Sequence, residues 1–251
     1  MELTVLGSSA AWPGPGLATS GYLLQEDGFR AVLDFGTGVL SNLQRFIPHE
    51  QLDAVIITHS HIDHCIDLYP LYMARLFHDE PLPPLPLYAP PGVFERVAAL
   101  EDEEGARQMR SLFDVHEVEP GSGFEAGPLR VSTRLLPHWV PNAGLRIEAG
   151  GRVLVYTGDT GPSEEVEALA RGADVLVAEA SWQDSQAEGR PPYHLTATQA
   201  ATHAARAEVG RLVLSHFWPG HDRDASRAEA AEAFPGDIVV ANEDLRVEVA
   251  G

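Results

Sequence analysis

The feature that most constrains this chain is a cluster of metal-binding residue types placed directly after a short apolar run. Residues 53–57 are rich in β-branched side chains, which predicts a buried strand. Residues 59–64 then read His-Ser-His-Ile-Asp-His. Side chains two positions apart in an extended segment point to the same side, so His59 and His61 can face one point, while the closing Asp-His pair can face a second. Catalytic zinc keeps one coordination position open, so four candidates facing two directions suggest half of a two-metal site.

Packing alone explains this cluster poorly. One histidine near an apolar strand is more often an ordinary surface or core residue than a ligand. Three histidines and a carboxylate beside a buried strand would leave polar groups unpaired, and burying such groups costs stability. Metal binding is therefore the favoured interpretation.

The motif resembles that of the metallo-β-lactamase superfamily, and four more positions match the family in the same order. Asp34, in Asp-Phe-Gly-Thr-Gly, stands where the family has an Asp that orients the metal-binding loop by hydrogen bonds. His138 matches the isolated histidine of the third motif, Asp159 the bridging carboxylate and His216 the last ligand. The resemblance covers most of the chain. The length of 251 residues favours one domain over residues 1–251, and the resemblance implies that it is folded as a four-layer αββα sandwich with the site at its upper edge.

The resemblance also implies how the ligands divide between two divalent ions, for which zinc is expected and manganese or iron would also suit His and Asp donors. One ion is assigned to His59, His61 and His138, the other to Asp63, His64 and His216, and Asp159 bridges them. Two metals ~3.5–4 Å apart can activate water and stabilise both the attacking and the leaving oxygen. Asp63 is also expected to orient the attacking hydroxide.

A second histidine segment is similar to the ribonuclease-Z-like branch of the superfamily. In that branch a histidine at the opening of a helix is catalytic and is not a metal ligand, and His194 stands at that place. Glu179, at the end of a predicted strand, matches the acidic residue that positions this histidine. His194 would then protonate the leaving alkoxide as a general acid. The alternative is that His194 and Thr196 only cap the helix, since Thr is a favoured N-cap.

The charge of the chain argues against a nucleic-acid substrate. It has 37 acidic and 17 basic residues and a net charge of −20, whereas tight binding to long nucleic acids depends on Lys and Arg at the phosphates. In ribonuclease Z the loop that corresponds to residues 7–21 carries basic residues, and here it has none. No basic, glycine-rich insertion could serve as the arm that grips transfer RNA.

Three segments look most like those of small bacterial phosphodiesterases that act on small phosphodiesters, including cyclic nucleotides. They are residues 7–9, 34–40 and 64–68. A binuclear phosphodiesterase is therefore the favoured function. A transfer-RNA 3′-processing endoribonuclease and a lactone or thioester hydrolase are the enzyme alternatives. A non-catalytic metal-binding scaffold is the alternative outside enzymes, although every ligand position is intact.

Sequence-level features also suggest a compartment. The chain begins directly with a strand-like segment, and no run approaches the ~20 apolar residues that a membrane span needs. The lone Cys65 excludes an internal disulfide and fits a reducing compartment. We expect a cytoplasmic protein with no membrane partner, and a homodimer remains open.

Hydrophobic periodicity predicts alternating strands and helices along the chain. The expected strands are 2–7, 21–25, 30–35, 53–57, 113–119, 129–136, 144–148, 152–156, 174–178, 211–215, 237–240 and 245–249. The expected helices are 65–78, 93–110, the segment opened by His194, and 225–234. The proline-rich residues 81–86 are expected to form a rigid connection.

Overall fold

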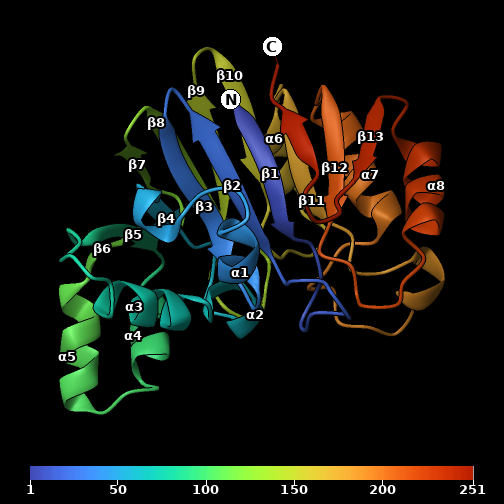
Figure 1. Cartoon of the computed structure of the whole chain (residues 1–251). Coiled ribbons are helices and arrows are strands. Elements are labelled where there is room, and N and C mark those ends of the chain that lie inside the picture. Colours follow the sequence, from blue (N-terminus) through green and yellow to red (C-terminus); the bar gives the residue numbers. More distant parts are fainter. Residues whose placement is uncertain (251) are drawn as a thin grey trace.

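The computed structural model describes residues 1–250 and contains two seven-stranded sheets packed face to face, with helices on both outer faces (Figure 1). This confirms the expected αββα sandwich. Helices α3 to α5 gather at the lower left of Figure 1, and α7 and α8 lie at the right. Among the described residues, no helix is both long and apolar enough to span a membrane.

The first half of the chain forms the first sheet, in the order β14-β1-β2-β3-β4-β5-β6. Its strands are β1 (Glu2–Gly7), β2 (Gly21–Glu26), β3 (Phe29–Phe35), β4 (Ala54–Ile56), β5 (Leu85–Ala89), β6 (Phe113–Glu117) and β14 (Arg246–Glu248). Its helices are α1 (Val39–Leu43), α2 (Ile62–Cys65), α3 (Leu68–Leu76), α4 (Val93–Ala98) and α5 (Glu103–Ser111). The last strand returns from the second half and pairs antiparallel with β1.

The second sheet has the order β13-β12-β11-β10-β9-β8-β7. Its strands are β7 (Gly123–Ala126), β8 (Leu129–Leu136), β9 (Asn142–Ala149), β10 (Arg152–Tyr156), β11 (Val175–Glu179), β12 (Arg211–Ser215) and β13 (Asp237–Val240). Its helices are α6 (Glu164–Ala170), α7 (Ala197–Arg206) and α8 (Arg223–Ala233).

Three hydrophobic clusters correspond to the three interfaces between the four layers. Because side chains alternate across a strand, Tyr22 and Leu24 of β2 join the cluster between the sheets, whereas Leu23 packs in the cluster beneath α1 to α5. On β12, Val213 faces the other sheet, while Leu212 packs in the cluster with α6 to α8. Both sheets are therefore covered on both faces, which explains the nearly continuous apolar runs in the sequence.

Strand direction places the functional loops at one edge. The pairs β3–β4, β10–β11 and β11–β12 are parallel, so within each sheet the segments that follow these strands leave the same end. Side chains from these segments of both sheets meet, so the two ends lie at one edge of the sandwich. In open parallel sheets this edge commonly holds the ligand site. The loops that carry the candidate metal ligands leave the strands β4, β8, β10 and β12 at this edge.

Two predicted helices differ in the structure. The helix predicted for 65–78 begins only at Leu68, as α3, while Cys65 ends the separate short helix α2. The break occurs because the amide of Asp67 donates to the carbonyl of Phe35 in β3 (2.9 Å) instead of continuing a helix. The segment 93–110 becomes α4 and α5, because the side chain of Asp102 accepts from the amides of Glu104 and Gly105 and begins a new helix. The prediction for 81–86 was partly wrong, since Leu85 and Pro86 already belong to β5.

Candidate metal centre

The structure brings together all seven residues that the sequence predicts as metal ligands. Their donor atoms fall into two groups, each with members within 4.8 Å of one another: His59, His61, His138 and Asp159 in one, and Asp63, His64 and His216 in the other. These residues come from loops separated by up to 157 positions in the sequence, so the convergence is a property of the fold.

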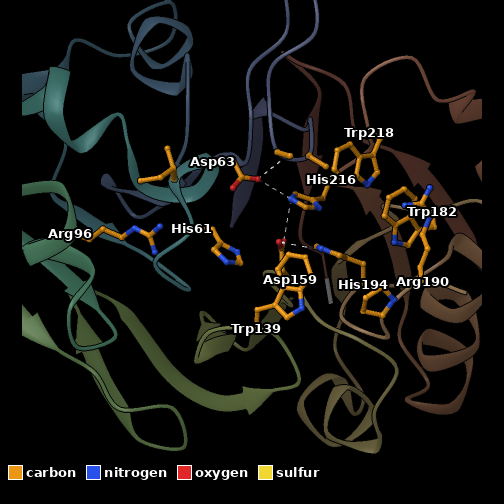
Figure 2. A pocket seen from close by; sticks show the side chains of 14 residues that line it. His61, Asp63, Arg96, Trp139, Asp159, Trp182, Arg190, His194, His216 and Trp218 are labelled. Carbon is orange, nitrogen blue, oxygen red and sulfur yellow. Dashed lines mark hydrogen bonds and ion pairs between the residues drawn. The ribbon is translucent and has the colours of Figure 1, made fainter. Parts of the chain in front are cut away.

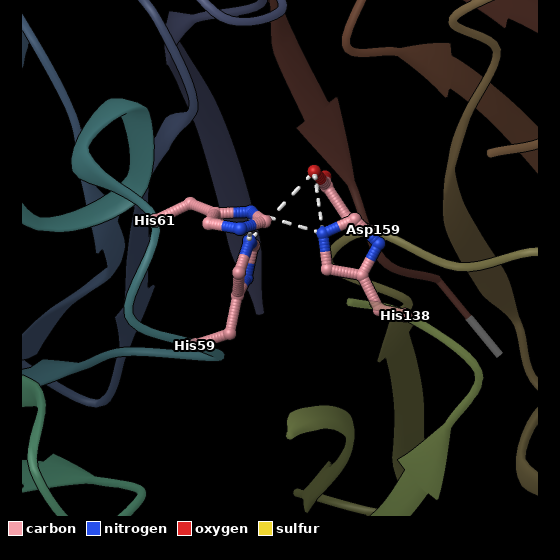
Figure 3. A group of neighbouring side chains, drawn as sticks. All are labelled: His59, His61, His138 and Asp159. Carbon is pink, nitrogen blue, oxygen red and sulfur yellow. Dashed lines mark hydrogen bonds and ion pairs between the residues drawn. The ribbon is translucent and has the colours of Figure 1, made fainter. Parts of the chain in front are cut away.

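The first group is a compact set of ring nitrogens facing one carboxylate oxygen (Figure 3). Nδ1 of His61 lies 3.1 Å from Nε2 of His59 and 3.0 Å from Nε2 of His138. Oδ2 of Asp159 lies 3.7 Å from Nε2 of both His59 and His138. A tetrahedral zinc ion with ~2.0–2.1 Å bonds would hold its ligand nitrogens ~3.3 Å apart, so this set fits such an ion.

The second group uses the other oxygen of the same carboxylate. Oδ1 of Asp159 lies 3.2 Å from Nε2 of His64 and 3.3 Å from Nε2 of His216, and these two nitrogens are 3.2 Å apart. Oδ2 of Asp63 lies 3.6 Å from Nε2 of His64 and 3.5 Å from Nε2 of His216. Oδ1 of Asp159 is buried and has no hydrogen-bond partner among the described residues, which is costly unless a cation binds there. Asp159 thus contributes one carboxylate oxygen to each group.

Four of the five candidate histidine ligands are held through Nδ1, which leaves Nε2 free for a metal, whereas His61 faces the group with Nδ1. Nδ1 of His64 lies 2.7 Å from Asp34 Oδ2, and that of His216 lies 2.9 Å from Ser181 Oγ. Nδ1 of His138 contacts the Tyr193 carbonyl at 3.0 Å. Nδ1 of His59 lies 2.9 Å from Thr58 Oγ1. Such partners fix the tautomer and orientation of metal-binding histidines.

The electrostatics favour a bound cation. Burial lowers the pKa of His59 well below its usual value and lowers the pKa of His61 to about 4, so both are neutral at pH 7. For Asp159, burial alone would raise the pKa, but His216 and His64 lower it well below the usual value. Burial would likewise lower the pKa of His64, yet Asp159, Asp63 and Asp34 raise it well above the ordinary value. The second group therefore attracts positive charge, whether a proton or a metal ion.

His194 and Glu179 form a pair beside the metal centre. Nδ1 of His194 lies 3.1 Å from each carboxylate oxygen of Glu179 and 4.0 Å from Asp159 Oδ2. Glu179 is itself fixed, because it accepts from the amide of Thr160 at 2.6 Å and from the hydroxyl of Ser181 at 2.6 Å. Burial alone would lower the pKa of His194, but the charge and hydrogen bond of Glu179 and the charge of Asp159 raise it to about 9.

The capping alternative for this segment applies to Thr196 and not to His194. Thr196 is the N-cap of α7, its hydroxyl accepts from the amide of Gln199, and the Gln199 side chain accepts from the Thr196 amide. His194 lies two residues before the cap and faces the metal centre. Because Asp159, His194 and His216 also place donor atoms within 4.8 Å of one another, geometry alone leaves open a direct contact between His194 and a metal ion.

Several supporting groups were missed by the sequence reasoning. The amide of Ala11, in the glycine- and proline-rich loop before β2, donates to Oδ2 of Asp63 at 2.8 Å. Ala11 and Asp34 both have a backbone φ of +55°, and His216 has a φ of +56°. Non-glycine residues with positive φ are costly and gather at functional sites. Ser181, which links Glu179 to His216, had no sequence signal that could single it out.

A cavity of about 540 Å³ opens above the metal centre. Figure 2 shows Arg96 on one side of His61, Asp63 and Asp159. Three large side chains lie on the other side: Trp182, Arg190 and Trp218. The lining residues are Ala10, Ala11, His61, Ile62, Asp63, Arg96, Trp139, Asp159, Trp182, Arg190, Pro191, His194, His216 and Trp218. None of the tryptophans or arginines that line this cavity was predicted to belong to the site.

A His/Asp cluster able to hold metal, placed at the strand ends of an αββα sandwich, is the arrangement of metal-dependent hydrolases with this fold. A family model described as a beta-lactamase superfamily domain matches residues 30–217. The chain therefore belongs to the metallo-β-lactamase superfamily, a family of metal-dependent hydrolases.

Particular relatives resemble the chain over nearly its whole length. An uncharacterized protein of Mycobacterium leprae, ML1173, is 38% identical over 99% of this chain and 89% of its own length. Ribonuclease Z of Mycobacterium bovis is 31% identical over 99% of this chain and 98% of its own. The crystal structure of YhfI from Bacillus subtilis, a metallo-β-lactamase fold protein, superposes with a TM-score of 0.89 at 29% identity, covering 98% of this chain and 99% of that one.

Proposed function

We propose that the protein is a binuclear metal-dependent phosphodiesterase that hydrolyses a small phosphodiester, with a cyclic nucleotide as the favoured candidate. The observation that carries the proposal is the combination of two donor groups sharing Asp159 with a His194–Glu179 pair beside them. When bound, two divalent ions would supply Lewis-acid charge to the phosphate oxygens and acidify a water molecule. Zinc suits the donors best.

The residues of this chain would divide the remaining work. Oδ2 of Asp63 is held by the Ala11 amide, so its Oδ1 is the atom that can accept a hydrogen bond from the attacking water and orient it toward phosphorus. As the bond between phosphorus and the leaving oxygen breaks, that oxygen needs a proton. Glu179 holds Nδ1 of His194, so Nε2 is the nitrogen that can donate it.

The substrate preference follows from charge and shape. The chain has a net charge of −20, which repels a long polyanion, and the cavity of about 540 Å³ lies within the range of small-ligand sites. A mononucleotide-sized diester fits both conditions. We therefore expect activity of the metal-loaded protein on bis-p-nitrophenyl phosphate and 3′,5′-cyclic AMP, and none on a panel of lactones. Lactone turnover without phosphodiester turnover would overturn the proposal.

His194→Ala separates a general acid from a residue that only shapes the site. A general acid contributes ~10²–10⁴-fold, so the variant should lose about that much on cyclic AMP, whose leaving group is an alkoxide. The loss should be much smaller on bis-p-nitrophenyl phosphate, whose phenolate leaves unaided. Metal content should remain that of the wild type. Equal losses on both substrates would reject the acid role, and loss of metal would make His194 a ligand.

A transfer-RNA 3′-processing activity is the second candidate, and the similarity to Ribonuclease Z of Mycobacterium bovis over almost the whole chain favours it. The acidic surface predicts weak binding of transfer RNA that disappears as salt is added. Site-specific cleavage of precursor transfer RNA at physiological salt would establish this candidate in place of the first.

A further inference from the structure

Three of the four tryptophans of the chain line the metal cavity and the fourth packs against one of them, although none is a candidate ligand. Trp139, Trp182 and Trp218 line the cavity, and the fourth, Trp12, packs edge-on against Trp218 with ring centroids 4.8 Å apart. Trp182 and Trp218 stack at 5.0 Å with an interplanar angle of 20°. The four residues come from four separate loops, so the fold assembles this aromatic wall at a single place.

Among the three tryptophans that line the cavity, Trp139 has the most exposed ring. It follows His138 directly, and 62% of its surface is exposed. Tyr193 braces it edge-on at 5.4 Å, while its centroid lies 6.3 Å from that of His61. A large apolar ring held rigidly beside a metal centre and left open to solvent indicates a ligand surface.

In the part of the chain that the structure describes, the two arginines of the cavity are not neutralised by carboxylates. All 17 basic residues are arginines, and ten of them form ion pairs with carboxylates. Among residues 1–250, neither Arg96 nor Arg190 has a carboxylate partner within 4.0 Å, although acidic residues outnumber basic ones by more than two to one. Unpaired guanidinium groups in a cavity favour an anionic ligand.

The positions of these two arginines differ. Arg190 lies over the ring of Trp182, with Cζ 3.9 Å from the centroid, and its Nε donates to the Gln186 carbonyl at 2.8 Å. Its terminal nitrogens therefore remain for a ligand. Arg96, from α4, lies on the opposite side of the metal centre and extends toward His61 (Figure 2). A phosphate at the metal centre would have a cation on one side and the aromatic wall on the other.

We propose that the cavity is a nucleoside-phosphate site in which the base stacks on the open face of Trp139, against the wall of Trp182 and Trp218, while Arg96 binds the phosphate. This inference rests on the proposed function and specifies its substrate class as a phosphodiester that carries a nucleobase. His194 lies between the two aromatic flanks, with centroids 6.3 Å from Trp139 and 6.4 Å from Trp182. A nucleotide uses both the rings and the guanidinium groups, whereas an acyl ester would leave the arginines without partners.

The direct test compares two ligands with the same phosphate, adenosine 5′-monophosphate and ribose 5-phosphate, binding to the zinc-loaded protein. Because three of the four tryptophans line the cavity, stacking of a base should quench much of the tryptophan fluorescence, and calorimetry gives the affinity independently. A stacked base contributes ~5–150-fold in affinity. We expect the adenosine ligand to quench and to bind at least ~10-fold more tightly than ribose 5-phosphate.

Variants assign this difference to particular side chains. Trp139→Ala should weaken adenosine 5′-monophosphate by ~10-fold or more and leave ribose 5-phosphate unchanged, while Trp139→Phe should keep most of the affinity. Phe77→Ala removes an aromatic side chain outside the cavity that is even more exposed, at 74%, and should change neither. Arg96→Gln should weaken both ligands by the same factor, and Arg171→Gln, at an exposed arginine outside the cavity, should weaken neither.

Equal affinity for the two ligands, or equal losses of both in Trp139→Ala, would overturn the proposal. Turnover of bis-p-nitrophenyl phosphate distinguishes this failure from that of the proposed function. If the diester is hydrolysed while the base adds no affinity, the nucleoside site alone is wrong. If the base adds affinity and no diester is hydrolysed, the phosphodiesterase activity alone is wrong.

Discussion

Replacing Asp34 by Asn tests how the fold prepares His64 for a metal ion. Asp34 is fully buried. Its Oδ1 accepts from the amide of Thr58 at 2.7 Å, and its Oδ2 contacts Nδ1 of His64 and the hydroxyl of Tyr156, both at 2.7 Å. A carboxylate can only accept, so Nδ1 of His64 carries the proton and Nε2 is free to bind a cation.

The side-chain amide introduced by Asp34→Asn would have only one orientation that suits its neighbours. The Thr58 amide can only donate, so it holds the new amide oxygen at the Oδ1 position and turns the NH2 group toward His64. Nδ1 must then accept, and Nε2 takes the proton and can no longer bind metal. Loss of such a partner usually lowers metal affinity ~10–100-fold. Because the tautomer is reversed here, we expect the upper end of this range for the ion held by Asp63, His64 and His216.

The assay is a chelator competition that measures the affinity of each ion, with metal equivalents counted by mass spectrometry. His49, Glu50 and His78 form a separate group with donor atoms within 4.8 Å of one another, which could bind a further metal ion. The wild type and Asp34→Asn are therefore both compared in a His78→Ala background, which removes this group. Asp53→Asn is the matched control, since Asp53 accepts from the Arg30 amide at 2.8 Å and lies away from the centre. Two ions bound with wild-type affinity in Asp34→Asn would refute the tautomer argument.

Asp34→Ala should cost more in stability than Asp34→Asn, at least ~4 kcal/mol in urea unfolding of the metal-free proteins. The amide and hydroxyl of Thr58, Nδ1 of His64 and the hydroxyl of Tyr156 lose their acceptor, at ~1 kcal/mol or more each. Gly36→Ala should destabilise by ~1–3 kcal/mol, since its Cβ would overlap the carbonyl oxygen of Asp63; an unchanged urea midpoint would show that this contact relaxes. Burial raises the pKa of the Cys65 thiol to about 12, so at pH 8 it stays protonated, and thiol reagents should label it only on unfolding; fast labelling of the native protein would contradict its burial. Stripping the metal should lower the free energy of unfolding by ~2.7 kcal/mol per site, relative to protein at a free metal concentration of 100 Kd; identical unfolding curves would speak against binding.

Local sequence patterns were sufficient to predict the elements whose structure depends on residues close together in the sequence. The strands at 129–136, 152–156, 211–215 and 237–240 were predicted with the bounds that the structure has, because apolar and β-branched residue types are properties of the segment itself. Thr196 was predicted as a helix cap, since a cap needs only the next turn of the helix. The seven candidate ligands could be selected because their residue types and order match a known family.

The tertiary structure decided what depends on contacts between distant loops. The division of the 65–78 segment follows from a hydrogen bond between Asp67 and β3, and the position of the Asp63 carboxylate follows from the Ala11 amide. Neither partner can be inferred from its own neighbourhood in the sequence.

The strongest example is the cavity above the metal centre. Local sequence gives an isolated Trp or Arg no functional signal, because either is more often an ordinary core or surface residue. Trp139 and Trp182 become two sides of one cavity only because β8 and β11 end at the same edge of the second sheet. Arg96 lines the same cavity from α4, a helix that covers the first sheet. The sequence by itself determined the chemistry of the metal ligands, whereas the packing of two sheets decided what surrounds them.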